Sequence, residues 1–171
     1  MEFLQLIKNR RSIRNFQEKE ISQAIVDKLI EALLWAPSAG NLQSRKFYFV
    51  FNKETKKELA GAALGQDFIA RAPLIVVGCS DNKIFWRYDQ RGKNLYSICD
   101  VACSIENLML VAYTEGLGSC WVGAFSEKKV VEILNLPRNL RPIVICPLGY
   151  PEKIPEPSPK VPKEKAIEII K

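Results

Sequence analysis

The chain has 171 residues, of which 47% are hydrophobic and 26% charged, and its formal net charge is +6. This length and apolar fraction predict one globular domain, residues 1–171, with a core of its own. The absence of histidine excludes Ser-His and Cys-His nucleophilic chemistry, so an enzyme with this sequence needs a cofactor for its reactivity.

The excess of cations suits an anionic ligand or nucleic acid. Charges of both signs are interspersed along the chain, however, which is typical of solvated helix faces, and we expect no nucleic-acid partner. No apolar run approaches the ~20 residues of a membrane span, and residues 1–14 are too charged for a secretion signal. The expectation is a cytoplasmic protein without a membrane partner.

Residues 1–9 predict a short amphipathic helix whose apolar side chains face inward, namely Phe3, Leu4, Leu6 and Ile7. The segment from Arg10 to Arg14, RRSIR, brings three cations and a hydroxyl together. Guanidinium groups match phosphate oxygens bidentately, and the hydroxyl adds a donor. This segment is a candidate phosphate site, and an exposed basic turn at the end of a helix is the alternative.

A second helix is predicted from the N-cap Ser22 to Trp35, and Pro37 then takes the chain out of helix. Its buried face would consist of Ile25, Val26, Leu29, Ile30, Leu33 and Leu34. The next segment, APSAGNLQ at residues 36–43, is rich in small and amide side chains. Asn41 and Gln43 carry donors and acceptors that suit the edge of a heterocycle, and a polar helix-to-strand loop is the alternative.

Residues 46–51 predict an aromatic-rich strand, and a charged helix follows over 53–64, with Lys56 expected on its exposed face. A turn at 65–67 and a short helical piece up to Pro73 lead to a buried strand over 74–79. Residues 81–96 are expected to be irregular, and they form either a mobile cover over a pocket or a surface loop.

The five cysteines lie inside apolar runs, at Cys79, Cys99, Cys103, Cys120 and Cys146. Free cysteine behaves as a small hydrophobic residue in a reducing compartment. Cys99 and Cys103 share a helix face, but neither histidine nor an acidic cluster accompanies them. The prediction is core packing and no metal site.

The most apolar stretch runs over residues 97–125. Ser97 and Asp100 match a capping box for a helix over 98–113 that has no polar side, which places this helix in a core or a subunit interface. Gly116 suits the left-handed position that ends such a helix. A short strand over 119–122 then meets Gly123, where a backbone can lie flat against a planar ligand or simply turn.

After this stretch, Ser126 predicts the start of a helix to Asn135, and residues 142–148 predict another apolar strand. Residues 149–162 are rich in proline and predict an extended, polyproline-like arm. A short amphipathic piece with Ala166, Ile167, Ile169 and Ile170 ends the chain. Because such an arm needs a surface, residues 149–171 are expected to embrace a partner subunit.

Together, RRSIR, APSAGNLQ and GLGSCWVGAF resemble the FMN-dependent nitroreductase family in identity, order and spacing, over essentially the whole chain. The resemblance implies an α+β fold with a mostly antiparallel central sheet flanked by helices. It also implies a homodimer that exchanges extended C-terminal arms and holds FMN at its interface. The chain lacks the long insertion that some relatives fold over the substrate.

The resemblance also implies roles for individual residues. The phosphate and ribityl contacts would be Arg10, Arg11 and Ser12, with Lys160 of the arm as a further cation, although Ser158 stands where many relatives have a second basic residue. The partner chain would contribute ring contacts from Pro37, Ser38, Ala39 and Asn41, with Gln43 and Gln66 as further candidates. The backbone wall beside the ring would be formed by Cys120, Val122 and Gly123.

The implied activity is hydride transfer from NADH or NADPH through flavin N5 to a flat organic acceptor, such as a nitroaromatic or quinone, with ping-pong kinetics. The catalytic groups would be the N–H of Val122, pointing at N5, and Arg14, which stabilises charge on the pyrimidine side. Three alternatives stay open: a flavin-binding protein without efficient turnover, a specialised flavin-cleaving or dehalogenating member, and a basic nucleic-acid-binding domain.

Overall fold

A four-stranded antiparallel sheet organises the computed structural model, which describes residues 2–171. The strand order is β1 (Arg45–Val50), β2 (Leu74–Asp81), β4 (Leu140–Gly149) and β3 (Gly118–Ser119). The two central strands pair along their length, with Val76 opposite Cys146, and both are apolar enough to be covered on two faces. The predicted α+β fold with a mostly antiparallel sheet is confirmed.

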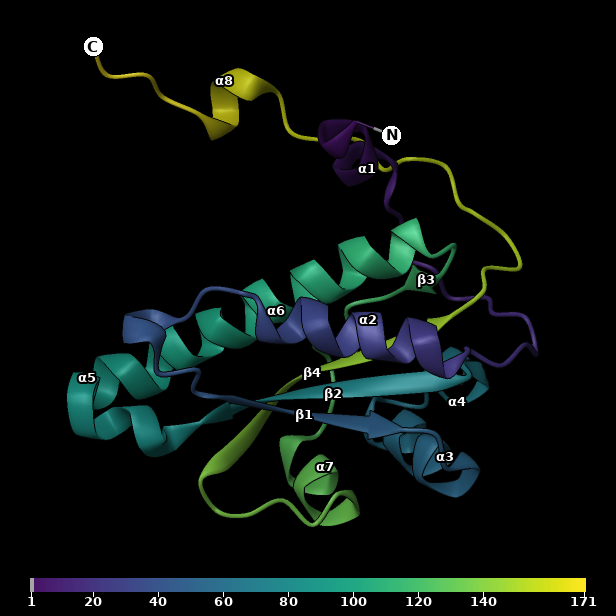
Figure 1. Cartoon of the computed structure of the whole chain (residues 1–171), viewed down its shortest axis with the longest axis horizontal. Helices are drawn as coiled ribbons and strands as arrows, with labels where there is room; N and C mark the ends of the chain where they lie inside the picture. Colours follow the sequence, from purple (N-terminus) through teal and green to yellow (C-terminus); the bar gives the residue numbers. More distant parts are fainter. Residues whose placement is uncertain (1) are drawn as a thin grey trace.

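Helices cover both faces of the sheet (Figure 1). One face packs on α2 (Gln23–Leu34) and α6 (Ser97–Thr114), through side chains such as Leu29 and Ile105. The other face packs on α3 (Lys53–Ala62), α4 (Phe68–Arg71) and α7 (Glu127–Ile133). Alternate residues of β2 serve the two cores, because successive side chains of a strand point to opposite faces.

The helix α6 begins differently from the prediction. A π-helical turn, Gly92–Tyr96, runs directly into it, so Ser97 lies inside continuous helix and its hydroxyl donates to the Lys93 carbonyl at 3.0 Å. The Asp100 carboxylate instead accepts the Ala39 N–H at 2.9 Å. The capping-box prediction is wrong, since both side chains have partners that the local sequence does not reveal.

One side of α6 is exposed in the single chain, at Cys99, Cys103 and Glu106. The predicted core packing of these two cysteines is therefore wrong for one chain, whereas the predicted alternative, a subunit interface along this helix, stays open. Cys79, Cys120 and Cys146 are buried as predicted. The described residues contain no cluster of three potential metal ligands, and the exposed side of α6 remains available to another surface.

The helical stretch Asn82–Thr114 is long and apolar enough to cross a membrane by length and composition alone. Its apolar residues, such as Val101 and Leu108 of α6, are fully buried against the sheet and α2. Because the core helix of a globular domain passes the same test, the packing of α6 accounts for this apolar character.

Asp81 ends β2 and residues 82–96 are helical, which contradicts the prediction of an irregular stretch over 81–96. They form α5 (Phe85–Arg91), preceded by a short 3-10 turn, Asn82–Ile84, and followed by the π-helical turn. The rings of Tyr88 and Tyr96 meet edge to face at 5.3 Å. Asp89 breaks the helix with a φ of 47°, and the segment forms the end of the molecule next to the start of α6 (Figure 1).

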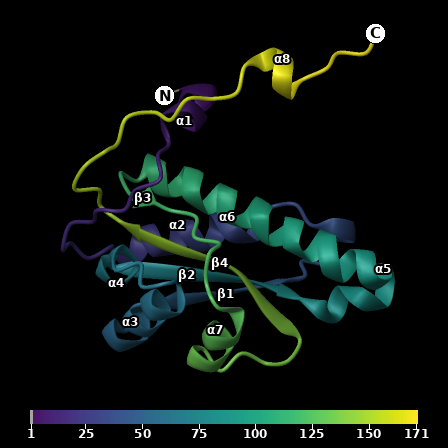
Figure 2. The same ribbon diagram turned by 180° about the vertical axis from the view of Figure 1, so that it is seen from behind.

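The N-terminal helix and the C-terminal arm lie on the same side of the molecule and are poorly covered, and the C-terminus lies well away from the N-terminal helix (Figure 2). In α1 (Phe3–Asn9) only Leu6 is buried, so the inward orientation predicted for Phe3, Leu4 and Ile7 is wrong in the single chain. The arm is attached through Tyr150 and Glu152, whose backbones bond residues 15–17. Beyond that point it runs past α1 and ends in the exposed α8 (Lys163–Ala166).

Four further expectations can be compared with the fold. Gly116 ends α6 with a φ of 76°, and Ser126 accepts the Lys129 N–H at the start of α7, as predicted. Ser22 precedes α2 without a side-chain capping bond. Lys56 is only 7% exposed, and its Nζ donates to the Ala72 carbonyl at 2.6 Å, so its assignment to an exposed face is wrong.

Candidate functional site

The segment after α1 is held in extended conformation against β3. Ile13 donates its N–H to the Ser119 carbonyl at 2.9 Å, and Ser12 pairs with Ser119 as a parallel bridge. Alternate side chains of an extended segment point to opposite sides. Arg10, Ser12 and Arg14 therefore share one side, which we call the cationic row, and Ile13 faces the other, where it packs closely on Gly118.

Cys120 shows which surface the cationic row faces. Its thiol is 2% exposed, and this burial raises the pKa of the Cys120 thiol. The nearby Arg14 charge, a hydrogen bond with Ser12 and the Arg10 charge act in the opposite direction and lower the same pKa. The three members of the row thus gather around Cys120, although they precede it by more than 100 residues in the chain.

The two adjacent arginines of this segment differ in their bonding. Arg11 Nη1 donates to the carbonyls of Lys8 at 2.7 Å and Arg10 at 2.9 Å, so it closes the end of α1. Arg10 Nη1 is buried and has no partner among the described residues. A buried guanidinium nitrogen without an acceptor is costly, so Arg10 fits an anionic group that is bound from outside the chain.

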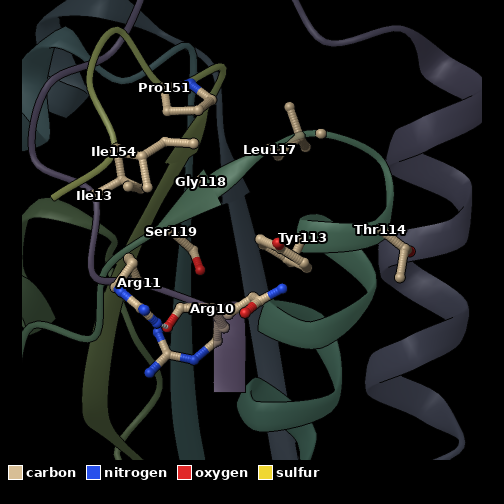
Figure 3. Close-up of a pocket in the computed structure, with 12 residues that line it drawn as sticks. Arg10, Arg11, Ile13, Tyr113, Thr114, Leu117, Gly118, Ser119, Pro151 and Ile154 are labelled. Carbon is tan, nitrogen blue, oxygen red and sulfur yellow. Dashed lines mark hydrogen bonds between the residues drawn. The ribbon is translucent and has the colours of Figure 1, made fainter. Parts of the chain in front are cut away.

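A cavity of about 300 Å³ opens beside these arginines (Figure 3). Arg10, Arg11 and Ser119 lie together at one end, and α6 contributes Tyr113 and Thr114. The remaining walls are mostly apolar and come from Ile13, Leu117, Pro151 and Ile154. The base of the arm therefore forms part of the same concave region as the start of the cationic row.

The chain after β3 runs along β4 as a backbone wall. Cys120 donates its N–H to the Pro147 carbonyl at 3.2 Å, and Val122 donates to the Ile145 carbonyl at 2.9 Å. The predicted direction of the Val122 N–H, toward a ligand, is therefore wrong. Since N–H groups alternate along an extended chain, those of Trp121 and Gly123 point away from β4, and neither has a partner among the described residues.

Gln66 lies at the end of this wall. Its Nε2 donates to the Ala63 carbonyl at 2.9 Å and to the Ala124 carbonyl at 3.4 Å. The side chain is therefore fixed one residue beyond Gly123, on the same part of the molecule as the wall. Gln66 and the backbone wall, which are distant in the sequence, are therefore neighbours in the fold.

The segment over residues 36–43, which we call the amide loop, has an unusual backbone. Gly40, Asn41 and Gln43 have φ values of 56°, 54° and 51°, in the left-handed region. Ser38 Oγ accepts the Gln43 N–H at 3.0 Å, and Ala39 is bonded to Asp100. Non-glycine residues in this region are strained and cluster at functional sites, so the loop is a candidate ligand contact.

The amide loop lies far from the cationic row within one chain. It is bonded to Asp100 at the start of α6, whereas the cavity is lined by Tyr113 at the end of that helix. With a rise of 1.5 Å per residue, these two positions are about 20 Å apart. Lys160 lies on the arm and is exposed, and no hydrogen bond links it to either group among the described residues. A single chain therefore does not unite the predicted contacts.

The model of the nitroreductase family matches residues 7–66 and 61–150, which is most of the chain. The chain belongs to the nitroreductase family. The family predicted from the three sequence motifs is thereby confirmed.

Individual members support this assignment. A curated protein of Archaeoglobus fulgidus, provisionally named NADH dehydrogenase/NAD(P)H nitroreductase, is 32% identical over 156 residues, which cover 88% of this chain and 86% of that protein. Nitroreductase A of Vibrio parahaemolyticus has a TM-score of 0.92 at 27% identity, covering 100% of this chain and 77% of the other. The NADPH:FMN oxidoreductase of Vibrio harveyi, solved with NAD⁺, has a TM-score of 0.91 at 28% identity, covering 99% and 77%.

Two residues of this nitroreductase-family chain were missed by the sequence analysis. Asp100 binds the amide loop, and Arg45 donates to the carbonyls of Leu34, Ala36 and Pro37 at 3.1, 2.8 and 2.9 Å. An acid near the start of an apolar helix was the available signal for Asp100, because buried carboxylates need partners. Arg45 gave no local signal, since a cation at a strand end is usually solvated.

Proposed function

We propose that this chain is an FMN-dependent oxidoreductase that takes hydride from NADH or NADPH and passes it to a flat organic acceptor, such as a nitroaromatic or quinone. The observation that carries the proposal is the buried Arg10 guanidinium nitrogen, which has no partner among the described residues and lies beside Ser12 and Cys120. A phosphate supplies the acceptor that this group needs. The relatives named for FMN and nitro reduction support the same chemistry.

Each part of the site then has a distinct task. Arg10 and Ser12 would hold the phosphate and ribityl end, with Lys160 as a further cation, while Arg11 supports Arg10 by closing α1. Arg14, at the exposed end of the row, would face the pyrimidine side, where a cation stabilises developing negative charge. FMN supplies hydride uptake and release at N5 when bound.

The wall would orient the ring. Val122 contributes through its pairing with Ile145, which fixes the direction of the backbone. The free N–H groups of Trp121 and Gly123 take over the donor role that the sequence analysis gave to Val122. Gly123 is exposed and carries no side chain, so a planar ring can lie against it, with Gln66 beside it. Nicotinamide and acceptor would use the same open face in turn, which gives ping-pong kinetics.

A homodimer would complete the site. The amide loop is about 20 Å from the cationic row along α6. A second copy packed with its α6 antiparallel brings its Pro37, Ser38, Ala39, Asn41 and Gln43 to the row of the first. Exposed apolar side chains support an interface: Phe3, Leu4 and Ile7 of α1, and Leu34 and Trp35 at the end of α2. The exposed side of α6 would also take part in this interface.

The arm over residues 149–171 would embrace the second copy. Ile154, Val161, Ile167, Ile169 and Ile170 are all exposed, and beyond Glu152 no hydrogen bond links the described arm to the body of its own chain. β1 lies at the edge of the sheet and offers unpaired backbone groups. An apolar, extended segment and an open strand edge are complementary, which supports arm exchange.

The decisive experiment is an absorbance spectrum of the purified protein, followed by anaerobic addition of NADH and then of NADPH. We expect flavin bands near ~370 and ~450 nm that bleach with at least one donor, because reduction removes the oxidised flavin chromophore. Flavin recovered intact after turnover with a quinone would exclude a flavin-cleaving enzyme. Parallel double-reciprocal plots at several donor concentrations would support the ping-pong scheme.

Other outcomes identify the alternatives. A yellow protein that neither donor reduces would be a flavin-binding protein without efficient turnover. A colourless protein that takes up no added FMN would contradict the proposal, and salt-sensitive binding to nucleic acid would then be measured. A mass of one chain by light scattering, at micromolar concentration and with FMN bound, would contradict the homodimer.

A further inference from the structure

Arg45 closes the end of α2. This residue begins β1, yet its guanidinium reaches the carbonyls of Leu34, Ala36 and Pro37. The last carbonyls of a helix have no partners within the helix, and a cation is favoured there by the helix dipole. Arg45 therefore stabilises the point at which the chain leaves α2 and enters the amide loop.

Asp100 holds the same loop from the other side. Its side chain is 3% exposed, Oδ1 accepts the Ala39 N–H at 2.9 Å, and Oδ2 is buried without a partner among the described residues. Burial lowers the pKa of Arg45, while the Asp100 charge raises it. The Asp100 charge therefore acts on Arg45, and the two residues hold backbone groups on both sides of Ser38.

The backbone beyond these bonds needs such support. Gly40, Asn41 and Gln43 have left-handed φ values, and such positions are strained for non-glycine residues. α5 adds a further contact, since Tyr88 Oη would lie 2.5 Å from a Cβ placed on Gly40. A strained loop retains one conformation only where its surroundings fix it.

We propose that Arg45 and Asp100 are positioning residues for FMN: they clamp the amide loop in the conformation that presents Ala39 and Asn41 to the flavin of a second copy. Neither residue needs to touch the cofactor. This inference rests on the proposed function, because the flavin is the ligand that the loop would contact. It adds that Asp100, at the buried start of α6, and Arg45, the first residue of β1, determine how tightly the loop binds FMN.

The test compares Asp100→Asn and Arg45→Met with two matched controls, Asp27→Asn and Lys46→Met, whose side chains are exposed. Asparagine keeps an oxygen for the Ala39 N–H but loses the charge beside Arg45. Two measurements are made on the full-length protein: hydrogen exchange of peptides from residues 36–44 without FMN, and titration with FMN followed by visible circular dichroism. Arg45→Lys serves as a milder variant, since one ammonium cannot bond all three carbonyls.

We expect exchange to rise about tenfold in residues 36–44 of both clamp variants and FMN binding to weaken about tenfold, which is 1.4 kcal/mol. Arg45→Met loses its hydrogen bonds, and Asp100→Asn replaces a charged acceptor with a weaker neutral one. The dichroism of the bound flavin should change, and Arg45→Lys should be intermediate. The controls should match the unaltered protein.

Unchanged exchange in residues 36–44, or equal FMN affinity in all variants, would overturn the inference. A rise in exchange spread evenly over the chain would also overturn it, since that result indicates general destabilisation. Should Arg45→Met fail to fold, the results for Asp100→Asn and Arg45→Lys decide whether the two residues clamp the loop. If the unaltered protein bound no FMN, the proposed function would fail, whereas the exchange measurement would still decide whether the clamp exists.

Discussion

The cationic row and the amide loop are positioned by different kinds of bonds. The row lies on a segment that pairs with β3 through backbone atoms, Ile13 N–H to Ser119 carbonyl. The amide loop is held by side chains, those of Arg45 and Asp100. Backbone pairing tolerates many substitutions, whereas a side-chain clamp depends on particular residues. We therefore expect the row to fail only when its own cations are changed, and the loop to fail through residues that never touch a ligand.

The largest expected effect concerns the row. Arg10→Ala should weaken FMN binding about a hundredfold, because a buried charge-assisted hydrogen bond is worth ~1.5–3 kcal/mol. Arg11→Ala should weaken it less than about fivefold, since Arg11 bonds backbone carbonyls of its own segment and the change costs only part of the support for Arg10. Both affinities can be measured by quenching of FMN fluorescence.

Lys57→Ala is the matched control for these two variants. Lys57 is exposed and pairs only with Glu54 on the same helix, whereas Lys56 is buried and would alter the stability of the fold. Equal losses of affinity for Arg10→Ala and Arg11→Ala would show that the alternation of side chains along the row does not decide phosphate contact.

A smaller effect is expected in the loop. Gly40→Ala places a side chain at a φ of 56°, which costs about 1–2 kcal/mol, and it also crowds Tyr88. FMN binding should weaken roughly five- to tenfold as the loop shifts, and the melting temperature should fall by about 2–8 °C. Gly61→Ala is the control, because Gly61 lies in α3 with open space around it and alanine favours helix. Identical FMN affinities for the two variants would mean that the backbone of the loop does not matter for binding.

The smallest expected effect concerns the Arg141–Glu127 pair, which belongs neither to the cationic row nor to the amide loop. Arg141 forms two hydrogen bonds to Glu127, at 2.7 and 2.9 Å, and these bonds lower the pKa of Glu127. A depressed carboxyl pKa adds stability above the unfolded-state pKa, and this stability is lost as pH falls through the folded-state pKa. Glu127→Gln should therefore cost ~0.5 kcal/mol at neutral pH, as for an exposed ion pair.

This cost should disappear as the medium is acidified, because the carboxyl of the unaltered protein is then protonated as well. Urea unfolding at a series of pH values would measure it, with FMN affinity expected to stay constant at neutral pH. A cost that grew on acidification would show that the sign of the linkage is wrong.

Local patterns predicted most of the secondary structure. The apolar run of β2, the αL position of Gly116 and the N-cap Ser126 each depend on a few neighbouring residues, and all three were identified correctly. The predictions failed where a side chain has a distant partner. The spacing of Ser97 and Asp100 fits a capping box, but in the structure Ser97 bonds the Lys93 carbonyl and Asp100 bonds the Ala39 N–H.

For the candidate site too, local sequence patterns predicted some features and missed others. Motif identity predicted which segments matter, RRSIR, APSAGNLQ and GLGSCWVGAF, and the family follows from them. The motifs did not predict that Arg10 and Arg11 have different partners, or that the Val122 N–H is used by β4. These details depend on which way each group points, and adjacent groups of an extended chain point to opposite sides.

The sequence by itself determined the fold class, the family and the segments that could bind a flavin, because periodicity, glycine and proline positions and motif spacing act over short distances. Only the tertiary structure decided which donors are free. It also showed that the cationic row and the amide loop lie at opposite ends of α6, and that Arg45 and Asp100 hold the loop. The physical reason is that a hydrogen bond between segments distant in the chain exists only once the fold brings its donor and acceptor within hydrogen-bonding distance.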